Sequence, residues 1–224
     1  MCFALASMLL TLSMEKPFNP ILGETFEARV GSDCHVALEQ ISHHPPISAV
    51  QVDSTDYFCD GHFEYRGDNG ANSLNASKVG HLRVHMRNTG LDYYVTYPTC
   101  KISGTMFGRR TFNYNGMLKI VCEQAGIQGF IIYNPDIKGA LKSLLGKKQR
   151  ADYFRGGILN DLKFEPSKKN LHKVPDEITV STIEGIWTQH IEFDGNRYWD
   201  INLEKPVKLD QLGETSLLSD SSRR

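Results

Sequence analysis

Two adjacent histidines, His43 and His44, stand in a segment whose residue types can bind an anion. The segment reads Glu39-Gln40-Ile41-Ser42-His43-His44-Pro45-Pro46. Neighbouring side chains on a strand point to opposite faces, but the two prolines end the hydrogen-bond ladder directly after the pair. We therefore expect an irregular strand end, where both imidazole rings reach one site and donate hydrogen bonds to an anion. Glu39 can accept a hydrogen bond from a ring N–H there, and Ser42 can contribute a hydroxyl.

A second segment with phosphate-binding chemistry precedes the histidines. It reads Lys16-Pro17-Phe18-Asn19-Pro20-Ile21-Leu22-Gly23-Glu24. Its two prolines fix φ and bias the residues before them towards extended geometry, so the segment is stiff and non-helical. A stiff segment can hold Lys16 and Asn19 in place. The lysine is a point charge for phosphate, and the asparagine amide can donate to a phosphoester or a hydroxyl.

The two segments together resemble the signature of the oxysterol-binding protein family. Residues 39–46 look like the family's E-Q-V-S-H-H-P-P, with Ile41 in place of valine, and residues 16–24 look like its K-P-F-N-P-x-x-G-E. The β-rich Gly-x-Trp run at Trp187 resembles a downstream strand of the family. The resemblance therefore extends over most of the chain.

The resemblance implies a fold and a cargo. The expected fold is mainly β, an incomplete antiparallel β-barrel around a lipid tunnel with minor helical elements. At the matching positions, Lys16, His43 and His44 are expected to contact the phosphorylated head group of phosphatidylinositol 4-phosphate, and Asn19 to contact lipid head groups. The other motif positions support this site: Pro17, Phe18, Pro20, Gly23, Glu24, Glu39, Gln40, Ser42, Pro45 and Pro46. The second lipid is expected to be a sterol or phosphatidylserine, exchanged through the same tunnel.

The resemblance also sets expectations for the whole protein. We expect a monomer that carries lipids between membranes, is cytoplasmic, and contacts anionic organelle membranes or membrane contact sites peripherally. We also expect that it needs no cofactor, binds no nucleic acid and catalyses no reaction. Residues 1–224 are expected to form one lipid-binding domain truncated at both ends. We expect the family's lid to be absent or reduced to the apolar run 1–13 and its C-terminal helical region to be missing.

The elements that must position these residues are strands. Apolar and polar residues alternate around residues 26–30, 36–38, 82–86 and 93–97, which is the period of a half-buried strand. Asn115-Gly116 and Asp194-Gly195 each lie between β-rich runs and predict tight hairpins. Such a series predicts an antiparallel meander that closes into a barrel or folds into a sandwich. The polar residues 67–78 predict a surface loop.

Charge and cysteine content narrow the setting. The formal net charge of −1 gives no overall attraction to nucleic acid or anionic membrane. A local basic excess in residues 136–170 is either a solvated loop, with a short amphipathic helix at 141–145, or a surface facing anionic head groups. The five cysteines are widely spaced and odd in number, which fits a reducing compartment.

Three other interpretations use the same residues. His35, His43 and His44 with Glu39 can be imagined as metal ligands, although no H-E-x-x-H spacing is present. A hydrolase using Ser42 lacks a G-x-S-x-G elbow, a Walker loop and a Rossmann fingerprint. The third interpretation is an interaction module that has kept the barrel and lost the tunnel.

Overall fold

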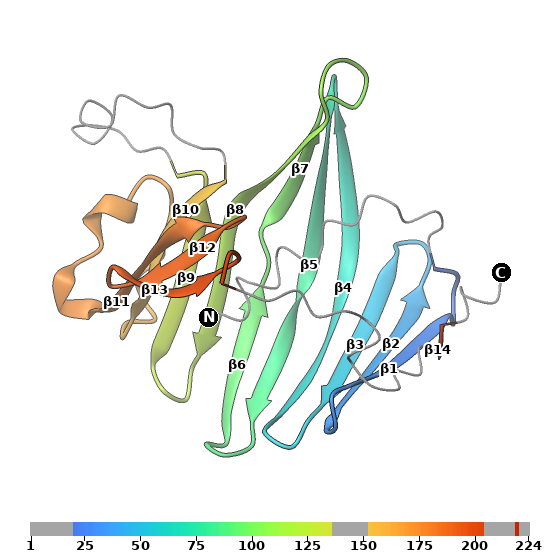
Figure 1. The fold of residues 1–224 in the computed structure, drawn as a ribbon, viewed down its shortest axis with the longest axis horizontal. Coiled ribbons are helices and arrows are strands. Elements are labelled where there is room, and N and C mark those ends of the chain that lie inside the picture. Colours follow the sequence, from blue (N-terminus) through green and yellow to red (C-terminus); the bar gives the residue numbers. More distant parts are fainter. Residues whose placement is uncertain (1–19, 136–151, 204–217, 220–224) are drawn as a thin grey trace.

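The computed structural model describes residues 20–135, 152–203 and 218–219. In this part the chain forms one antiparallel sheet of fourteen strands, in the order β13-β12-β11-β10-β9-β8-β6-β5-β4-β3-β2-β1-β14, with β7 pairing with β5 and β8 (Figure 1). The strands are β1 (Thr25–Val30), β2 (Cys34–Ser42), β3 (Ile47–Asp53), β4 (Tyr57–Gly70), β5 (Ser73–Met86), β6 (Leu91–Thr96), β7 (Thr99–Ser103), β8 (Thr111–Cys122), β9 (Ile127–Tyr133), β10 (Tyr153–Leu159), β11 (Thr179–Ile186), β12 (His190–Phe193), β13 (Asn196–Asp200) and β14 (Leu218–Ser219). Two short 3₁₀ helices, η2 (Leu171–Lys173) and η3 (Asp176–Ile178), precede β11.

The expected mainly β fold is confirmed, and the barrel is open. The sheet twists across its width, and its edge strands β13 and β14 do not pair with each other in the part described (Figure 1). No described segment forms a helix of the length and hydrophobicity that crossing a bilayer requires. Of the basic stretch 136–170, residues 136–151, which include the expected helix, lie outside the described residues.

Over β1–β8 strand alternation places apolar side chains mainly on one face of the sheet, because directly opposed residues of paired strands share a face. At β9 and β10 the opposite face is apolar as well, and Phe130, Ile132 and Leu159 are buried there. One row of opposed positions runs across nine strands and is apolar or glycine throughout: Phe26, Leu38, Val50, Gly61, Leu82, Val95, Ile120, Gly129 and Ile158. We call the side of the sheet that carries this row the apolar face. The other side carries a polar row that includes Glu27, Gln51, Asp60 and Arg83.

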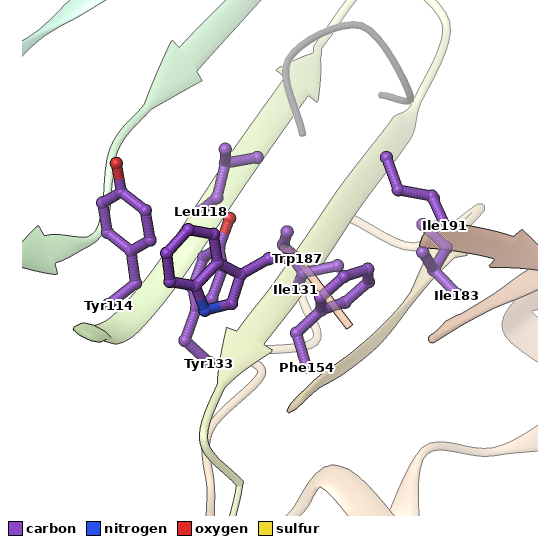
Figure 2. Close-up of a cluster of buried hydrophobic side chains, with 8 residues drawn as sticks. All are labelled: Tyr114, Leu118, Ile131, Tyr133, Phe154, Ile183, Trp187 and Ile191. Atoms are coloured by element: carbon purple, nitrogen blue, oxygen red, sulfur yellow. The ribbon is translucent and has the colours of Figure 1, made fainter. Parts of the chain in front are cut away.

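The dense core lies at the β8–β12 end of the apolar face. Figure 2 shows eight buried side chains that pack there: Tyr114, Leu118, Ile131, Tyr133, Phe154, Ile183, Trp187 and Ile191. The ring centres of Trp187 and Tyr114 are 5.0 Å apart, and the two rings pack edge to face. Towards β1–β3 the same face is covered less, and Leu38 remains 37% exposed. The apolar face therefore extends beyond the packed core, and among the described residues no segment covers it completely at β1–β3.

The prediction of a hairpin at Asn115-Gly116 is wrong. β8 runs through this dipeptide without reversing, pairing with β7 as far as Asn115 and with β9 from Gly116 onwards. Gly116 has a positive φ of 86°, so the glycine bends one long strand as it changes partners. The Asp194-Gly195 hairpin is confirmed: Phe193 pairs with Asn196, and both turn residues have positive φ.

The prediction of a surface loop at residues 67–78 is also wrong. β4 extends to Gly70 and β5 begins at Ser73, so most of the polar stretch forms a long hairpin. Its backbone pairs in register as far as Gly70 and Ser73, and β7 adds a third strand beside β5. Ladder hydrogen bonds and a third strand outweigh the low β propensity of asparagine and glycine here.

Candidate functional site

His43 and His44 lie in the turn between β2 and β3. Their ring centres are 4.6 Å apart with an interplanar angle of 59°, and both side chains are exposed. β2 ends irregularly just before them: Gln40 opposes Ser48 and Ser42 opposes Ile47, which leaves Ile41 as an extra residue. The expected irregular strand end is therefore present. Both rings lie side by side at the rim of the sheet, open to solvent.

Gln40 anchors this turn from the apolar face. It is only 4% exposed. Its Nε2 donates to the Ser42 carbonyl at 2.7 Å, and its Oε1 accepts from the Ser48 hydroxyl at 2.6 Å. These bonds tie the end of β2 to the start of β3 across the extra residue. The side chain thereby fixes the strand end from which the histidines project.

The end of the first motif joins the same strand. The Gly23 N–H donates to the Gln40 carbonyl at 2.8 Å, and the Gln40 N–H donates to the Glu24 carbonyl at 2.9 Å. A tight turn precedes this pairing, because the Ile21 N–H donates to the Glu24 carboxylate at 3.0 Å and Gly23 has a φ of 78°. Lys16, Pro17, Phe18 and Asn19 lie outside the described residues. The structure thus brings the end of the first motif beside the start of the second.

The remaining motif residues take different directions. Glu39 opposes Thr25 and Ala49, and its side chain lines a groove of about 710 Å³ on the polar side of β1–β5. It forms no hydrogen bond or ion pair with either histidine in the part described. The Pro46 carbonyl accepts from the Tyr65 N–H at 3.0 Å, which attaches the turn to β4. Pro45 is exposed and Pro20 is half-buried.

The imagined metal ligands are not gathered. His35 opposes Asp53 near the start of β2, at the opposite end of that strand from His43. Among the described residues no three His, Cys, Asp or Glu side chains are arranged to hold a metal ion. Within the part described, no third metal-ligating side chain joins His43 and His44.

A lysine on the apolar face is the feature that the sequence did not reveal. Lys78 Nζ lies 5.5, 5.7 and 5.3 Å from the ring centres of Phe63, Tyr65 and Tyr97, within the range of cation–π attraction. Burial lowers the pKa of Lys78 and raises the pKa of the Tyr97 phenol. The lysine lines a cavity of about 200 Å³ with Ala76 and other residues of β5–β8. Lys78 keeps the period-two spacing of Leu82 and Val84, but the polar composition of residues 67–78 predicts a loop there.

This cavity adjoins the histidine turn through Tyr65. Tyr65, which lines the cavity, donates its N–H to Pro46 of the turn. The arrangement therefore offers two exposed imidazoles at the rim of the sheet and an apolar wall that carries one half-buried cation, Lys78. Such a site can bind an amphipathic molecule, with an anionic group at the rim and hydrocarbon along the wall.

Comparisons with known proteins point in the same direction. The family model described as oxysterol-binding protein matches residues 1–214. "Oxysterol-binding protein 9" of Dictyostelium discoideum is 30% identical over 225 residues, covering 99% of this chain and 52% of that protein. "Oxysterol-binding protein-related protein 8" of Homo sapiens is 31% identical over 185 residues, covering 80% of this chain and 18% of that protein. The chain spans about half the length of the first relative and less of the second.

Solved structures share the fold. The Osh3 ORD of Saccharomyces cerevisiae, solved in complex with PI(4)P, superposes with a TM-score of 0.68 at 21% identity, covering 94% of this chain and 52% of that one. The Osh1 ORD domain in complex with ergosterol superposes with a TM-score of 0.65 at 23% identity, covering 92% and 44%. At these identities the likeness concerns the arrangement of the strands.

Proposed function

Because the chain belongs to the oxysterol-binding protein family, we propose that it binds single lipids and transfers them between membranes. The polar head of phosphatidylinositol 4-phosphate binds at Lys16, Asn19, His43 and His44. A sterol or phosphatidylserine occupies the same tunnel in exchange. The protein acts without catalysis, as a cytoplasmic monomer in peripheral contact with organelle membranes or membrane contact sites.

The observation that carries the proposal is the pairing of the two motifs. Gly23 and Glu24 hydrogen-bond to Gln40, three residues before His43. Residues 20–24, which directly follow the segment with Lys16 and Asn19 in the sequence, therefore lie beside β2, the strand that leads to the histidines. Imidazole and ammonium groups are donors that suit phosphate oxygens, and charge-assisted hydrogen bonds are the stronger kind.

The apolar face supports the choice of a lipid over a soluble phosphate. Hydrocarbon placed along the row from Phe26 to Ile158 gains roughly 0.8 kcal/mol for each buried CH₂. A chain of a dozen methylenes would thus contribute far more than the head group alone. One wall that takes one set of chains at a time also makes two cargoes compete, which couples the transfer of one to the return of the other.

Lipid extraction tests the proposal directly. The protein is incubated with liposomes containing phosphatidylinositol 4-phosphate, and the lipid recovered with the soluble protein is quantified and identified by mass spectrometry. We expect one unaltered lipid per chain, displaced by liposomes rich in sterol or phosphatidylserine. Recovery of a hydrolysed lipid would replace the proposal by a hydrolase. A folded protein that extracts nothing would favour an interaction module.

A further inference from the structure

The loop between β7 and β8 exposes two large apolar side chains at its end. Met106 is 69% exposed and Phe107 is 73% exposed. They are consecutive in the sequence, and Gly108, Arg109 and Arg110 follow them directly. We call residues 104–110 the tip loop. Exposed apolar residues that occur singly are normal, but an adjacent pair on a projecting loop is a candidate contact surface.

Asn72 of the β4–β5 turn fixes the shape of the tip loop. Its Oδ1 accepts from the Met106 N–H at 2.9 Å and from the Phe107 N–H at 3.0 Å, and its Nδ2 donates to the Phe107 carbonyl at 2.9 Å. The Gly104 N–H donates to the Asn72 carbonyl at 3.0 Å, and Gly104 has a φ of 75°. One side chain from the neighbouring hairpin thus satisfies the backbone groups beside the apolar pair. The side chains themselves are left to point outwards.

Two arginines complete the loop with positive charge. Arg109 and Arg110 are exposed, and neither forms a hydrogen bond or ion pair through its side chain with another described residue. A guanidinium near a membrane surface favours anionic phosphate and carboxylate groups. The tip loop therefore combines an exposed apolar pair with two neighbouring positive charges.

Strand register places the tip loop at the same end of the sheet as the histidine turn. Ile47, which follows the turn, opposes Glu64 of β4, and β4 then continues in the same direction to Gly70. Ser73 at the start of β5 opposes Ser103 of β7, directly before the loop. Six further residues of strand carry the tip roughly 20 Å past the turn at about 3.3 Å per residue. Figure 1 shows this loop as the upper extreme of the sheet.

We propose that the tip loop is a membrane wedge that inserts Met106 and Phe107 into the interface of an anionic bilayer. Arg109 and Arg110 bind the lipid head groups around it. A narrow projecting end suits a deformable bilayer better than a rigid protein surface, which needs a matching cavity. Internal satisfaction of the backbone by Asn72 lowers the cost of leaving water. The wedge needs only anionic lipid, so it does not depend on which cargo the protein carries.

Vesicle sedimentation tests the wedge. The vesicles contain phosphatidylcholine and phosphatidylserine, without phosphoinositide or sterol, so cargo binding does not contribute. We expect the protein to sediment with them, and Met106→Asp with Phe107→Asp to weaken binding at least about tenfold, the ratio that 1.4 kcal/mol represents. Arg109→Glu with Arg110→Glu should remove the dependence on phosphatidylserine. Val180→Asp, at a position 57% exposed on β11, is the matched control and should bind like the unmodified protein.

A fluorescence measurement reports on insertion itself. Phe107→Trp should give emission that shifts to shorter wavelength with vesicles and is quenched by lipids brominated in their acyl chains, beyond any change in the unmodified protein. The aspartate pair should leave binding of a water-soluble short-chain phosphoinositide unchanged, which separates failure of the wedge from failure of the proposed cargo site.

Several results would overturn the wedge. The aspartate pair could sediment as well as the unmodified protein, or the emission of the Phe107→Trp variant could remain unshifted on vesicles that bind it. Absence of binding to anionic vesicles would have the same meaning. Self-association in sedimentation velocity runs without vesicles, lost in the aspartate pair, would assign the loop to contact with a second copy of the chain.

Discussion

The Gln40 carbonyl accepts a hydrogen bond from the Gly23 N–H, with 2.8 Å between oxygen and nitrogen. Gln40 also donates its own N–H to the Glu24 carbonyl, so one residue of β2 is paired through both of its backbone groups with the two residues before β1. Its side chain holds the other side of the strand end through Ser42 and Ser48. The described end of the first motif and the strand end before the histidines are therefore linked through Gln40.

Gln40→Leu should destabilise the protein and weaken head-group binding. Leucine suits the apolar face in size, but it leaves the Ser42 carbonyl and the Ser48 hydroxyl without their partner. Each of the two lost hydrogen bonds contributes about 0.5–1.5 kcal/mol, so the free energy of unfolding in urea should fall by about 1–3 kcal/mol. Gln51→Leu, at an exposed position on β3, is the control and should change it little. Equal losses in both variants would show that Gln40 has no special part in the strand end.

His43→Ala with His44→Ala should abolish phosphoinositide binding and spare the fold. Both side chains are exposed and no hydrogen bond of either contributes to the described structure, so the unfolding midpoint should hardly move. Loss of two hydrogen bonds to a charged group, at about 1.5–3 kcal/mol each, predicts at least about a hundredfold weaker binding. Isothermal titration with a short-chain phosphatidylinositol 4-phosphate measures it. His35→Ala is the matched control, and normal binding by the double variant would remove the histidines from the site.

Asp194 should make stability depend on pH in acid. Its carboxylate accepts from the Thr182 N–H at 2.7 Å and the Ser181 hydroxyl at 2.8 Å, and these bonds hold the pKa of Asp194 below its usual 3.8. The stabilisation is therefore complete above the unfolded pKa and is lost as pH falls through the lower folded pKa. Urea unfolding should show Asp194→Ala less stable than the unmodified protein near neutral pH. The difference should shrink below about pH 3.8, and a constant difference would contradict the assignment.

Sequence patterns predicted strands well where one face alternates. The apolar row through Leu38 and Leu82 follows directly from period-two patterning, and Asp194-Gly195 turns as expected. Patterning failed at Gly116, because a glycine with positive φ bends a continuous strand as readily as it closes a hairpin. It failed again at Lys78, because the long hairpin that places this lysine among aromatic rings depends on pairing with β7.

The site shows the same division between local and long-range information. Residue types and the two prolines predicted an irregular end at His43 and His44. The pairing of Gly23 with Gln40 joins segments seventeen positions apart and follows from the β1–β2 register, which no local pattern specifies. No sequence pattern predicted that Met106 and Phe107 are exposed, since their exposure depends on the hydrogen bonds that Asn72 makes to their backbone.

Filling the cavity beside Lys78 should block the cargo. Ala76 faces this cavity of about 200 Å³ and opposes Cys100 on β7. Ala76→Trp would fill it with an indole ring, so hydrocarbon that occupies it in the lipid complex loses its place. Exclusion of two or three methylenes costs about 2 kcal/mol at roughly 0.8 each, or roughly thirtyfold in affinity.

Liposome extraction measures the effect, and circular dichroism confirms that the sheet is intact. Asn75→Trp is the matched control, because consecutive side chains of a strand point to opposite faces and this indole would lie on the polar side. If Ala76→Trp is folded and extracts lipid as well as Asn75→Trp does, the hydrocarbon does not enter this cavity. The lipid would then lie along the β1–β4 part of the apolar face, where Leu38 is the position to substitute next.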